Sequence, residues 1–304
     1  MGMERKPAWL RVRLSDTIKY NSVNEIIKSH KLTTVCEEAN CPNRVDCYSK
    51  RTATFMILGN QCTRNCRFCN IRQGILEEPD LLEPTRVALA VKDLGLVHAV
   101  ITSVTRDDLP DQGASLFVST INAIKKVSNK TIVEVLIPDM QYDSKAIDLV
   151  IEAEPAVINH NVETVPRLYK TVRPEADYKR SLKVLSYIKK KNSNILTKSG
   201  LMLGLGETID EVKAVISDLK KAGVDCLTIG QYLQPSQDHI KMTEYITPQV
   251  FELLATYAKS IGIIGVASAP LVRSSYYAKD LYEQMLSSAG RDKEWVEKER
   301  NLGC

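Results

Sequence analysis

Short apolar runs alternate with helix-periodic stretches along most of the chain. The apolar runs predict strands at residues 52–58, 98–104, 131–137, 156–161, 196–203, 225–231 and 263–267. Apolar residues at every third or fourth position predict helices at 84–94, 113–127, 143–152, 179–191, 207–222 and 248–260. Outside this array, a helix is expected at 22–29, capped by Asn21 or Ser22, and another in the charged tail at 279–300.

Repeated strand-helix units with short connections predict parallel strands joined by right-handed crossovers. Six or seven such units favour the α/β class and a partial (β/α)6 TIM-type barrel over an open doubly wound sheet. No G-x-G-x-x-G follows the first strand, so a dinucleotide-binding fold is not indicated. We expect an N-terminal extension over 1–51, the barrel over 52–270 and a C-terminal segment with a charged helix over 271–304.

Composition narrows the cellular setting. The 304 residues carry 41 basic and 37 acidic side chains, and a net charge of +4 does not suggest a nucleic-acid partner. Eight cysteines are too few for a secreted disulfide scaffold. No apolar run approaches the roughly 20 residues of a membrane span, and the charged start does not resemble a secretory signal. We therefore expect a protein of the reducing cytoplasm without a membrane or nucleic-acid partner, and a monomer is the default expectation.

Three thiols stand close together directly after the first predicted strand. Cys62, Cys66 and Cys69 have the spacing C-x3-C-x2-C, and disulfides between such near neighbours would close strained loops. A structural zinc site normally needs four ligands, and no fourth Cys or His stands nearby. Three thiolates suit an iron–sulfur cluster that leaves one iron open to a substrate. Phe68 is an aromatic residue placed to pack over a bound purine.

A second triplet, Cys36, Cys41 and Cys47, lies ahead of the barrel with the spacing C-x4-C-x5-C. Pro42 and Asn43 favour a turn that folds the three thiols toward one point. From spacing alone, a stabilising metal knuckle and a second cluster both stay open.

Polar or glycine-rich residues follow five of the predicted strands, where barrels place their chemistry. They are the Cys62 loop, 106–108, 159–163, 204–207 and 231–232. Without further information, the polar segment 159–163 is equally a turn cap. The glycines at 204 and 206 lack the Lys and Ser/Thr of a P-loop, so close backbone approach is expected there. Cys226 is expected in the core, and His160 and His239 are expected to be buried and hydrogen-bonded.

The first triplet described resembles the motif of radical S-adenosylmethionine (SAM) enzymes, which have an α/β barrel. The whole pattern of two triplets is similar to the lipoyl synthases. The resemblance extends to KPAWLR (6–11), TATFMILG (52–59), TSVTRDDL (102–109), NHNVETVP (159–166), TKSGLMLGLGE (197–207) and RSSY (273–276), and so covers the chain up to about Tyr276.

This resemblance implies a chemistry. It implies two 4Fe-4S clusters, of which the one on Cys62, Cys66 and Cys69 cleaves SAM to a 5′-deoxyadenosyl radical. The other cluster would give up sulfur for insertion at C6 and C8 of an octanoyl chain carried on a protein lysine. In that family the second serine of RSSY completes the auxiliary cluster, which makes Ser275 a fourth ligand here. Tyr277 departs from the histidine that usually follows.

A similar segment in biotin synthase suggests the SAM contacts. Asn161 and Glu163 match residues that contact the ribose, and a downstream arginine meets the methionine carboxylate. Arg180 is the nearest counterpart of that arginine, with Arg173 competing because the intervening lengths differ. A carboxylate suits paired hydroxyls, and a guanidinium suits a carboxylate.

The resemblance also implies partners. They are octanoylated lipoyl carrier domains (of a 2-oxoacid dehydrogenase E2 or the glycine-cleavage H protein), an electron donor such as ferredoxin or flavodoxin, and an iron–sulfur carrier for cluster repair. Two alternatives remain at this point: a methylthiotransferase-like two-cluster enzyme, and a non-catalytic two-cluster electron carrier. Production of deoxyadenosine from SAM would distinguish an enzyme from a carrier.

Overall fold

A computed structural model describes residues 6–11, 17–50 and 52–288 of the chain. Within these residues the main sheet has eight strands in the order β1-β2-β5-β6-β7-β8-β9-β10. Strand β1 pairs antiparallel with β2, and every other pairing in this sheet is parallel. The strands are β1 (Thr33–Thr34), β2 (Thr54–Ile57), β5 (His98–Ser103), β6 (Ile132–Leu136), β7 (Val157–Asn159), β8 (Leu196–Leu203), β9 (Cys226–Gln231) and β10 (Gly265–Ser268).

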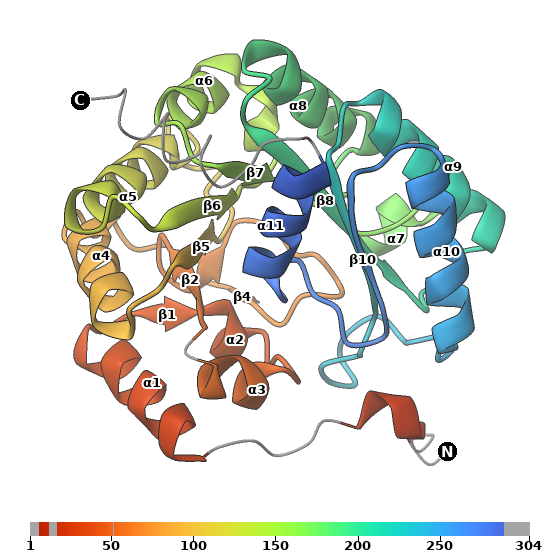
Figure 1. Ribbon diagram of the computed structural model, residues 1–304, viewed down its shortest axis with the longest axis horizontal. Coiled ribbons are helices and arrows are strands. Elements are labelled where there is room, and N and C mark those ends of the chain that lie inside the picture. The colour runs from red at the N-terminus through yellow and green to blue at the C-terminus, as the bar shows by residue number, and fades with distance from the viewer. Residues whose placement is uncertain (1–5, 12–16, 51, 289–304) are drawn as a thin grey trace.

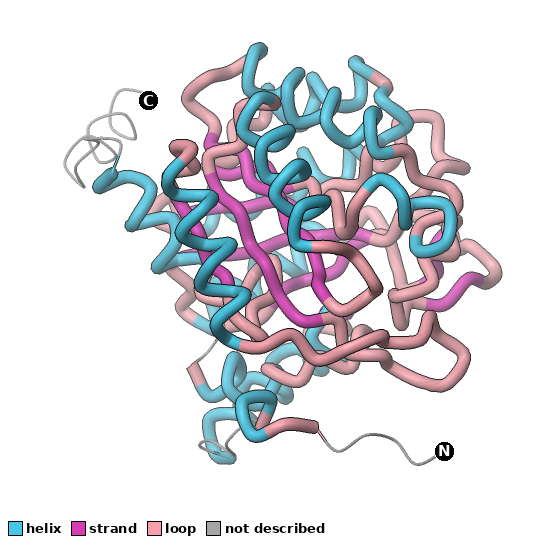
Figure 2. The backbone as a smooth tube through the Cα atoms, turned by 90° about the vertical axis from the view of Figure 1, so that its right-hand side faces the viewer, coloured by secondary structure: helices cyan, strands magenta, loops and turns pink. Residues whose placement is uncertain are grey.

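The crossover helices form an outer ring around this curved sheet (Figure 1). They are α4 (Glu83–Leu94), α5 (Ala114–Val127), α6 (Ser144–Glu152), α8 (Tyr178–Lys191), α9 (Ile209–Lys221) and α10 (Pro248–Ser260). Shorter elements are η1 (Ala8–Leu10), η2 (Met140–Tyr142), η3 (Pro166–Leu168), α7 (Tyr169–Val172) and the strand pair β3 (Gln61–Cys62) and β4 (Arg72–Gln73). Figure 2 shows the strands running obliquely inside the helices. The predicted partial barrel with its six strand-helix units is confirmed.

The segment ahead of the barrel is more helical than predicted. Helix α1 spans Thr17–Ser29, so the prediction that it begins after Asn21 or Ser22 was wrong. Its first turns are held by tertiary contact, because the Tyr20 ring stacks on the Tyr48 ring with centroids 5.4 Å apart. The predicted turn at Pro42 and Asn43 is present, between two unpredicted short helices, α2 (Val35–Glu38) and α3 (Arg44–Ser49).

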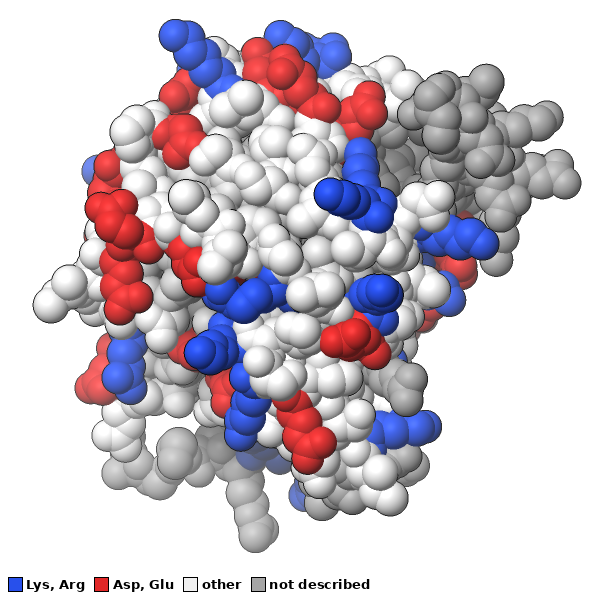
Figure 3. Space-filling view, turned by 90° about the vertical axis from the view of Figure 1, so that its left-hand side faces the viewer, with Lys and Arg blue, Asp and Glu red and all other residues white. Residues whose placement is uncertain are grey.

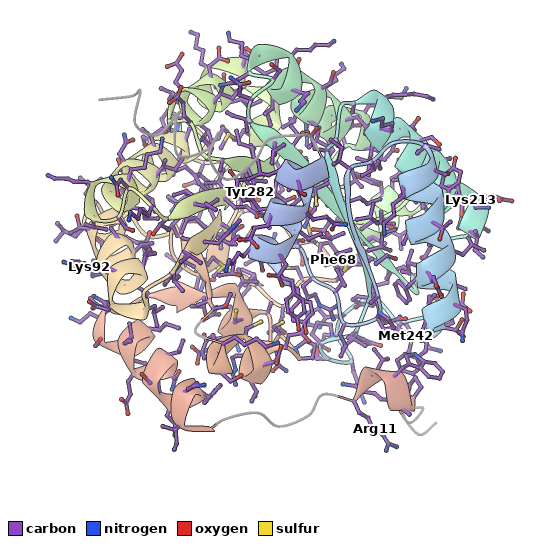
Figure 4. The ribbon with its side chains drawn as sticks, viewed as in Figure 1. Arg11, Phe68, Lys92, Lys213, Met242 and Tyr282 are labelled. Atoms are coloured by element: carbon purple, nitrogen blue, oxygen red, sulfur yellow. The ribbon has the colours of Figure 1, made fainter. Side chains whose placement is uncertain are left out.

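One end of the barrel is closed by α11 (Ala278–Ser288), which lies over the strands at the centre of Figure 1. Leu281, Tyr282 and Met285 of this helix pack against Leu196 and Cys226, so the expected core position of Cys226 is confirmed. The tail helix was predicted to extend to residue 300, and its part beyond 288 lies outside the described residues. Figure 4 shows Tyr282 near the centre of the molecule and Lys92 and Lys213 on its outer rim.

A charged group is buried inside the barrel. Lys198 Nζ donates to Glu134 Oε1 at 2.8 Å, and Glu134 Oε2 lies 3.1 Å from His98 Nε2. Both partners of the Lys198–Glu134 pair are 1% exposed. A buried charge without its partner is costly, so each member of this group depends on the others.

The outer surface shown in Figure 3 mixes the two signs of charge over the face that carries α4 and α5. Acidic and basic side chains are interspersed there with broad uncharged areas. Among the described residues, no helix combines the length and apolar character needed to cross a membrane.

Candidate cofactor cavity

A cavity of about 490 Å³ lies at the carboxyl ends of the parallel strands. This volume falls within the roughly 300–1,000 Å³ of small-molecule sites. Thiols of both cysteine triplets and the serine of the C-terminal motif line it together: Cys36, Cys41, Cys62, Cys66, Cys69 and Ser275. The structure therefore brings together at one site residues from the start, the first strand end and the last part of the described chain.

The Cys62–Cys69 loop is shaped by backbone hydrogen bonds. The backbone N–H groups of Arg64 and Thr105 both donate to Cys62 Sγ at 3.4 Å. Cys69 N donates to Cys66 O at 2.9 Å, which makes a tight turn between the second and third thiols. Donors directed at a sulfur stabilise its thiolate form and tune any iron bound to it.

Burial makes the free thiols of Cys66 and Cys69 weak acids. It raises the pKa of Cys69 to about 12, and neighbouring cysteines add to the effect. It also raises the pKa of Cys66, although the Arg173 guanidinium opposes this shift. A bound metal ion reverses this preference, because a coordinating thiol loses its proton outright. Cys66 and Cys69 are therefore protonated when free, and each becomes a thiolate ligand when it binds metal.

The other triplet surrounds a smaller hollow that opens beside the main cavity. Cys36 lies in α2, Cys47 lies in α3, and Cys41 lies between these helices. All three line the hollow together with Ser275 and Thr54. Burial raises the pKa of Cys36 to about 11 and that of Cys47 still further.

Hydrogen bonds join the two ends of the described chain around this hollow. Thr54 Oγ1 donates to Ser275 Oγ at 2.7 Å across 221 residues of sequence. Asn43 Nδ2 donates to Leu271 O at 2.6 Å. Lys50 Nζ donates to the Tyr277 hydroxyl at 2.9 Å, so the residue that departs from the usual histidine contributes to this junction.

The segment after β7 supplies polar groups to the cavity. Asn161 Nδ2 donates to Glu163 Oε1 at 3.0 Å and to Ser274 Oγ at 2.6 Å, while Asn161 Oδ1 has no partner. Glu163 has a positive φ of 64°, and a non-glycine residue in that region is strained. Burial raises the pKa of Glu163, and Arg173 counteracts this. The segment is thus more than a turn cap, because it places these side chains on the cavity wall.

The two candidate arginines are separated by the structure. Arg173 lines the cavity, and its Nη1 donates to Asn161 O at 3.0 Å. Arg180 is absent from the cavity wall, and its Nε donates instead to Asp139 at 2.8 Å. Of the two candidates, only Arg173 therefore lies on the cavity wall, while Arg180 points to Asp139. The spacing in the sequence could not show which arginine lines the cavity, because the direction of a side chain depends on the groups it pairs with.

Phe68 lines the same cavity and packs near Tyr232 and Met202. Figure 4 shows it close to the centre of the molecule. Sequence reasoning assigned no role to Arg273, a half-buried side chain on the cavity wall beside Glu163 and Cys41. Its position at the start of the RSSY segment was the available signal.

The structure also bears on the expectations for the glycine-rich turn after β8 and for the two histidines. Gly204 has φ 100°, and an added Cβ would lie 2.6 Å from the carbonyl oxygen of Glu244, so close backbone approach is confirmed. His160 is buried, and its Nδ1 lies 2.9 Å from Ile137 O, but its Nε2 has no partner. His239 is only partly buried, and its Nε2 lies 3.1 Å from Cys69 O.

The donor set fits an iron–sulfur cluster. Among the described residues, no three Cys, His, Asp or Glu side chains converge closely enough to share a single metal ion. A four-iron cluster takes one thiolate per iron and does not need such convergence. Each triplet offers three sulfurs on one wall, and the N-terminal triplet has Ser275 beside it.

Comparison with known proteins places the chain among iron–sulfur enzymes of the radical SAM superfamily. A model of the radical SAM superfamily matches residues 56–230. A lipoyl synthase of Alkaliphilus metalliredigens is 51% identical over 284 residues, covering 93% of this chain and 98% of that protein. A lipoyl synthase of Caldicellulosiruptor saccharolyticus is 54% identical over 280 residues, covering 92% and 98% respectively.

Solved structures of lower identity share the fold. The FeFe-hydrogenase maturase HydG from Carboxydothermus hydrogenoformans superposes with a TM-score of 0.59 at 15% identity, over 88% of this chain and 70% of that chain. Streptococcus suis SuiB bound to S-adenosylmethionine superposes with a TM-score of 0.54 at 10% identity, over 72% and 51% respectively.

The barrel, the cavity at its strand ends and the match to the family model define a radical SAM enzyme, a class that uses a 4Fe-4S cluster and SAM. The relatives then narrow the class. This chain belongs to the lipoyl synthase family, since the two relatives above are 51% and 54% identical to it over more than nine-tenths of its length. It is therefore an enzyme that inserts sulfur into a protein-bound octanoyl chain, and the two alternatives named above do not apply.

Proposed function

We propose that the two cysteine triplets hold two different 4Fe-4S clusters. Cys62, Cys66 and Cys69 would hold the catalytic one. Cys36, Cys41, Cys47 and Ser275 would hold an auxiliary one, which is consumed as the sulfur donor. The supporting observation is that five of the six cysteines line the main cavity with Ser275, and that the sixth, Cys47, lines the smaller hollow beside it. When bound, such clusters supply the electron that cleaves SAM and the sulfur that is inserted.

The residues around Ser275 suit a replaceable ligand. A hydroxyl oxygen is a poor iron ligand beside thiolates, and Thr54 holds that oxygen through a hydrogen bond of 2.7 Å. Ser275 thereby lines the hollow with its hydroxyl held by a neutral hydrogen bond and not by an ion pair. A ligand of this kind allows a cluster to be dismantled while its three thiolates stay in place.

We further propose that the cavity wall orients SAM. Phe68 would pack on the purine, and Asn161 with Glu163 would bind the ribose hydroxyls. Arg173 would bind the methionine carboxylate, since it is the cavity-facing member of the two candidate arginines. The Asn161 Oδ1 atom is buried without a partner, which leaves an acceptor ready for a hydroxyl.

The partners follow from the same chemistry. We propose octanoylated lipoyl domains of an E2 component or a glycine-cleavage H protein as substrates. A ferredoxin or flavodoxin would supply electrons, and an iron–sulfur carrier would restore the auxiliary cluster. Thiols that must stay free to bind iron suit a reducing cytoplasm. The three proposed segments, 1–51, 52–270 and 271–304, keep their roles in this scheme, although β1 of the first segment joins the barrel sheet.

The test is to prepare the full chain anaerobically with iron and sulfide and to count both. Two clusters predict about eight irons and eight sulfides per chain. Replacing Cys62, Cys66 and Cys69 by Ala should halve both counts and abolish deoxyadenosine production. Replacing the other triplet should also halve them but leave SAM cleavage intact.

The variant Ser275→Ala separates SAM cleavage from sulfur donation. It should still produce deoxyadenosine but fail to add sulfur to an octanoylated carrier, as read by mass. Ser260→Ala, which removes an exposed hydroxyl that donates only to Tyr257 O, is the control for loss of a serine hydroxyl away from the cavity. Four irons in the wild-type chain, or sulfur addition by Ser275→Ala at the wild-type rate, would contradict the proposal.

A further inference from the structure

The first half of the Cys62–Cys69 loop is attached along its length to the segment after β5. Thr63 N and Thr63 Oγ1 both donate to Thr105 O at 3.0 Å. Asp107 N in turn donates to Thr63 Oγ1 at 3.2 Å. Together with the bond from Thr105 N to Cys62 Sγ, these contacts place Cys62 relative to the neighbouring strand end. The loop is therefore not held by its thiols alone.

Arg64, between the first two cysteines, extends this attachment to two strand ends. Its Nε and Nη2 donate to the two oxygens of Asp107 at 2.7 and 2.8 Å. Nη2 also donates to Asp139 Oδ1 at 2.7 Å. Asp107 follows β5 and Asp139 follows β6, which are neighbours in the sheet. One guanidinium thus connects the loop to both strand ends.

This cluster of charges is balanced and has a buried centre, while Asp107 and Arg180 at its edge are partly exposed. The side chain of Arg64 is 4% exposed, and that of Asp139 is fully buried. Asp139 also accepts from Arg180 Nε at 2.8 Å, so two arginines face two aspartates. Although burial opposes ionisation, Arg64 holds the pKa of both carboxyl groups below the usual range. Geometry of this quality is what makes a buried ion pair tolerable.

We propose that Arg64 is a positioning residue, which clamps the Cys62 end of the cluster loop to the ends of β5 and β6 and so sets how the open iron receives SAM. The proposal rests on the assignment of the catalytic cluster to Cys62, Cys66 and Cys69. Arginine is required because its planar fork reaches both oxygens of Asp107 and still bonds Asp139. A lysine offers a single point charge and cannot make this arrangement.

The test uses the full chain, reconstituted anaerobically, in the variants Arg64→Lys, Arg64→Gln and Arg64→Gln/Asp107→Asn. SAM is titrated against the change it causes in the electron paramagnetic resonance spectrum of the reduced catalytic cluster. Loss of a group that orients metal ligands typically costs about 10- to 100-fold. We therefore expect the SAM midpoint to rise roughly tenfold or more in both single variants, with the spectrum altered.

The double variant separates geometry from charge. It restores the charge balance but not the clamp, so SAM binding should remain weak. Arg167→Gln is the matched control, because Arg167 also makes a two-point pair with a carboxylate, Glu211, at 2.7 and 2.9 Å on the exposed surface. Its SAM midpoint and spectrum should stay at the wild-type values.

Three results would overturn the inference. Wild-type SAM binding by Arg64→Lys would show that the fork is not needed, even if Arg64→Gln fails to load iron. Wild-type binding by Arg64→Gln would show that the clamp is not needed. Full recovery in the double variant would reduce the role of Arg64 to charge compensation. If the wild-type chain itself shows no SAM-dependent spectrum, the cluster assignment fails instead.

Discussion

At the scale of the residue, burial decides the acid–base behaviour of the cavity wall. His160 is 1% exposed, and its removal from water, aided by the nearby positive charge of Arg173, lowers its pKa to about 4. The imidazole is therefore neutral in the folded chain at neutral pH. In the unfolded chain it takes up a proton near its ordinary value of about 6.5.

This difference predicts a dependence of stability on pH. Because the folded-state pKa is lowered, His160 contributes stability that is present above about pH 6.5 and is lost as the pH falls toward 4. Each pH unit in this window removes up to about 1.4 kcal/mol from the free energy of unfolding. Chemical denaturation of the apoprotein at pH 7 and pH 5 should show the loss, and His160→Gln should show a smaller one. An equal loss in that variant would contradict the prediction.

Sequence reasoning at this scale identified the thiols but not their surroundings. Cys62, Cys66 and Cys69 were predicted from spacing, since three thiols so close together suit few other uses. Arg64 stands inside the same motif, yet nothing local shows that its guanidinium meets Asp107 and Asp139. Those carboxylates belong to other strand ends, and only packing brings them together.

At the scale of the element, the turns at the ends of strands and helices tolerate the fewest residue types, because their backbone conformation and close contacts favour glycine. After β8, Glu207 accepts backbone hydrogen bonds from Gly204 and Leu205, which folds the turn back on itself. Gly204 has φ 100° and lies against Gln231 and the Glu244 carbonyl. Gly95 ends α4 with φ 63° and has no atom near the position of an added Cβ.

These two glycines form a matched pair for mutation. Gly95→Ala incurs only the left-handed backbone penalty, about 1–2 kcal/mol. Gly204→Ala adds a collision with a backbone carbonyl, and we expect a total loss of about 3 kcal/mol or more. Thermal and chemical unfolding of the two apoproteins measures the difference. Equal losses would mean that the turn after β8 yields more easily than the contacts indicate.

Most elements could be predicted at this scale because alternating periodicity is a local property. The strand at 196–203 and the helix at 248–260 were predicted with the bounds that the structure shows. Helix α1 begins earlier than predicted, since Tyr20 gains a stacking partner in Tyr48 that lies outside the local pattern. The short helices α2 and α3 escaped prediction because they span too few residues to show a period.

At the scale of the whole molecule, the barrel has one open and one closed end. The cavity lies at the strand ends that carry the cysteine loop, while α11 packs against residues near the opposite strand ends. Met285 is 1% exposed and touches the position of an added Cβ on Gly265. The cofactor cavity and the helix that closes the barrel thus lie at opposite ends of the strands.

This separation predicts a loss of stability without a loss of cofactor capacity. Met285→Ala should lower the free energy of unfolding by about 2–5 kcal/mol, as expected for a buried side chain. Lys279→Ala, at an exposed position of the same helix, is the control and should change little. Iron content after anaerobic loading below the unfolding temperature should stay at the wild-type value in both variants. A loss of iron in Met285→Ala alone would show that the two ends are coupled.

The sequence by itself determined the alternation of strands and helices, and it determined which thiols form triplets. Both are local properties, set by periodicity and by spacing within a loop. Only the tertiary structure decided that Arg173 rather than Arg180 faces the cavity. Ser275 lies beside Cys36, as the family resemblance implied, although 239 positions separate the two in the numbering and no local pattern links them. Such neighbours depend on which strand ends meet when the sheet closes, and long-range packing, not any local pattern, sets that.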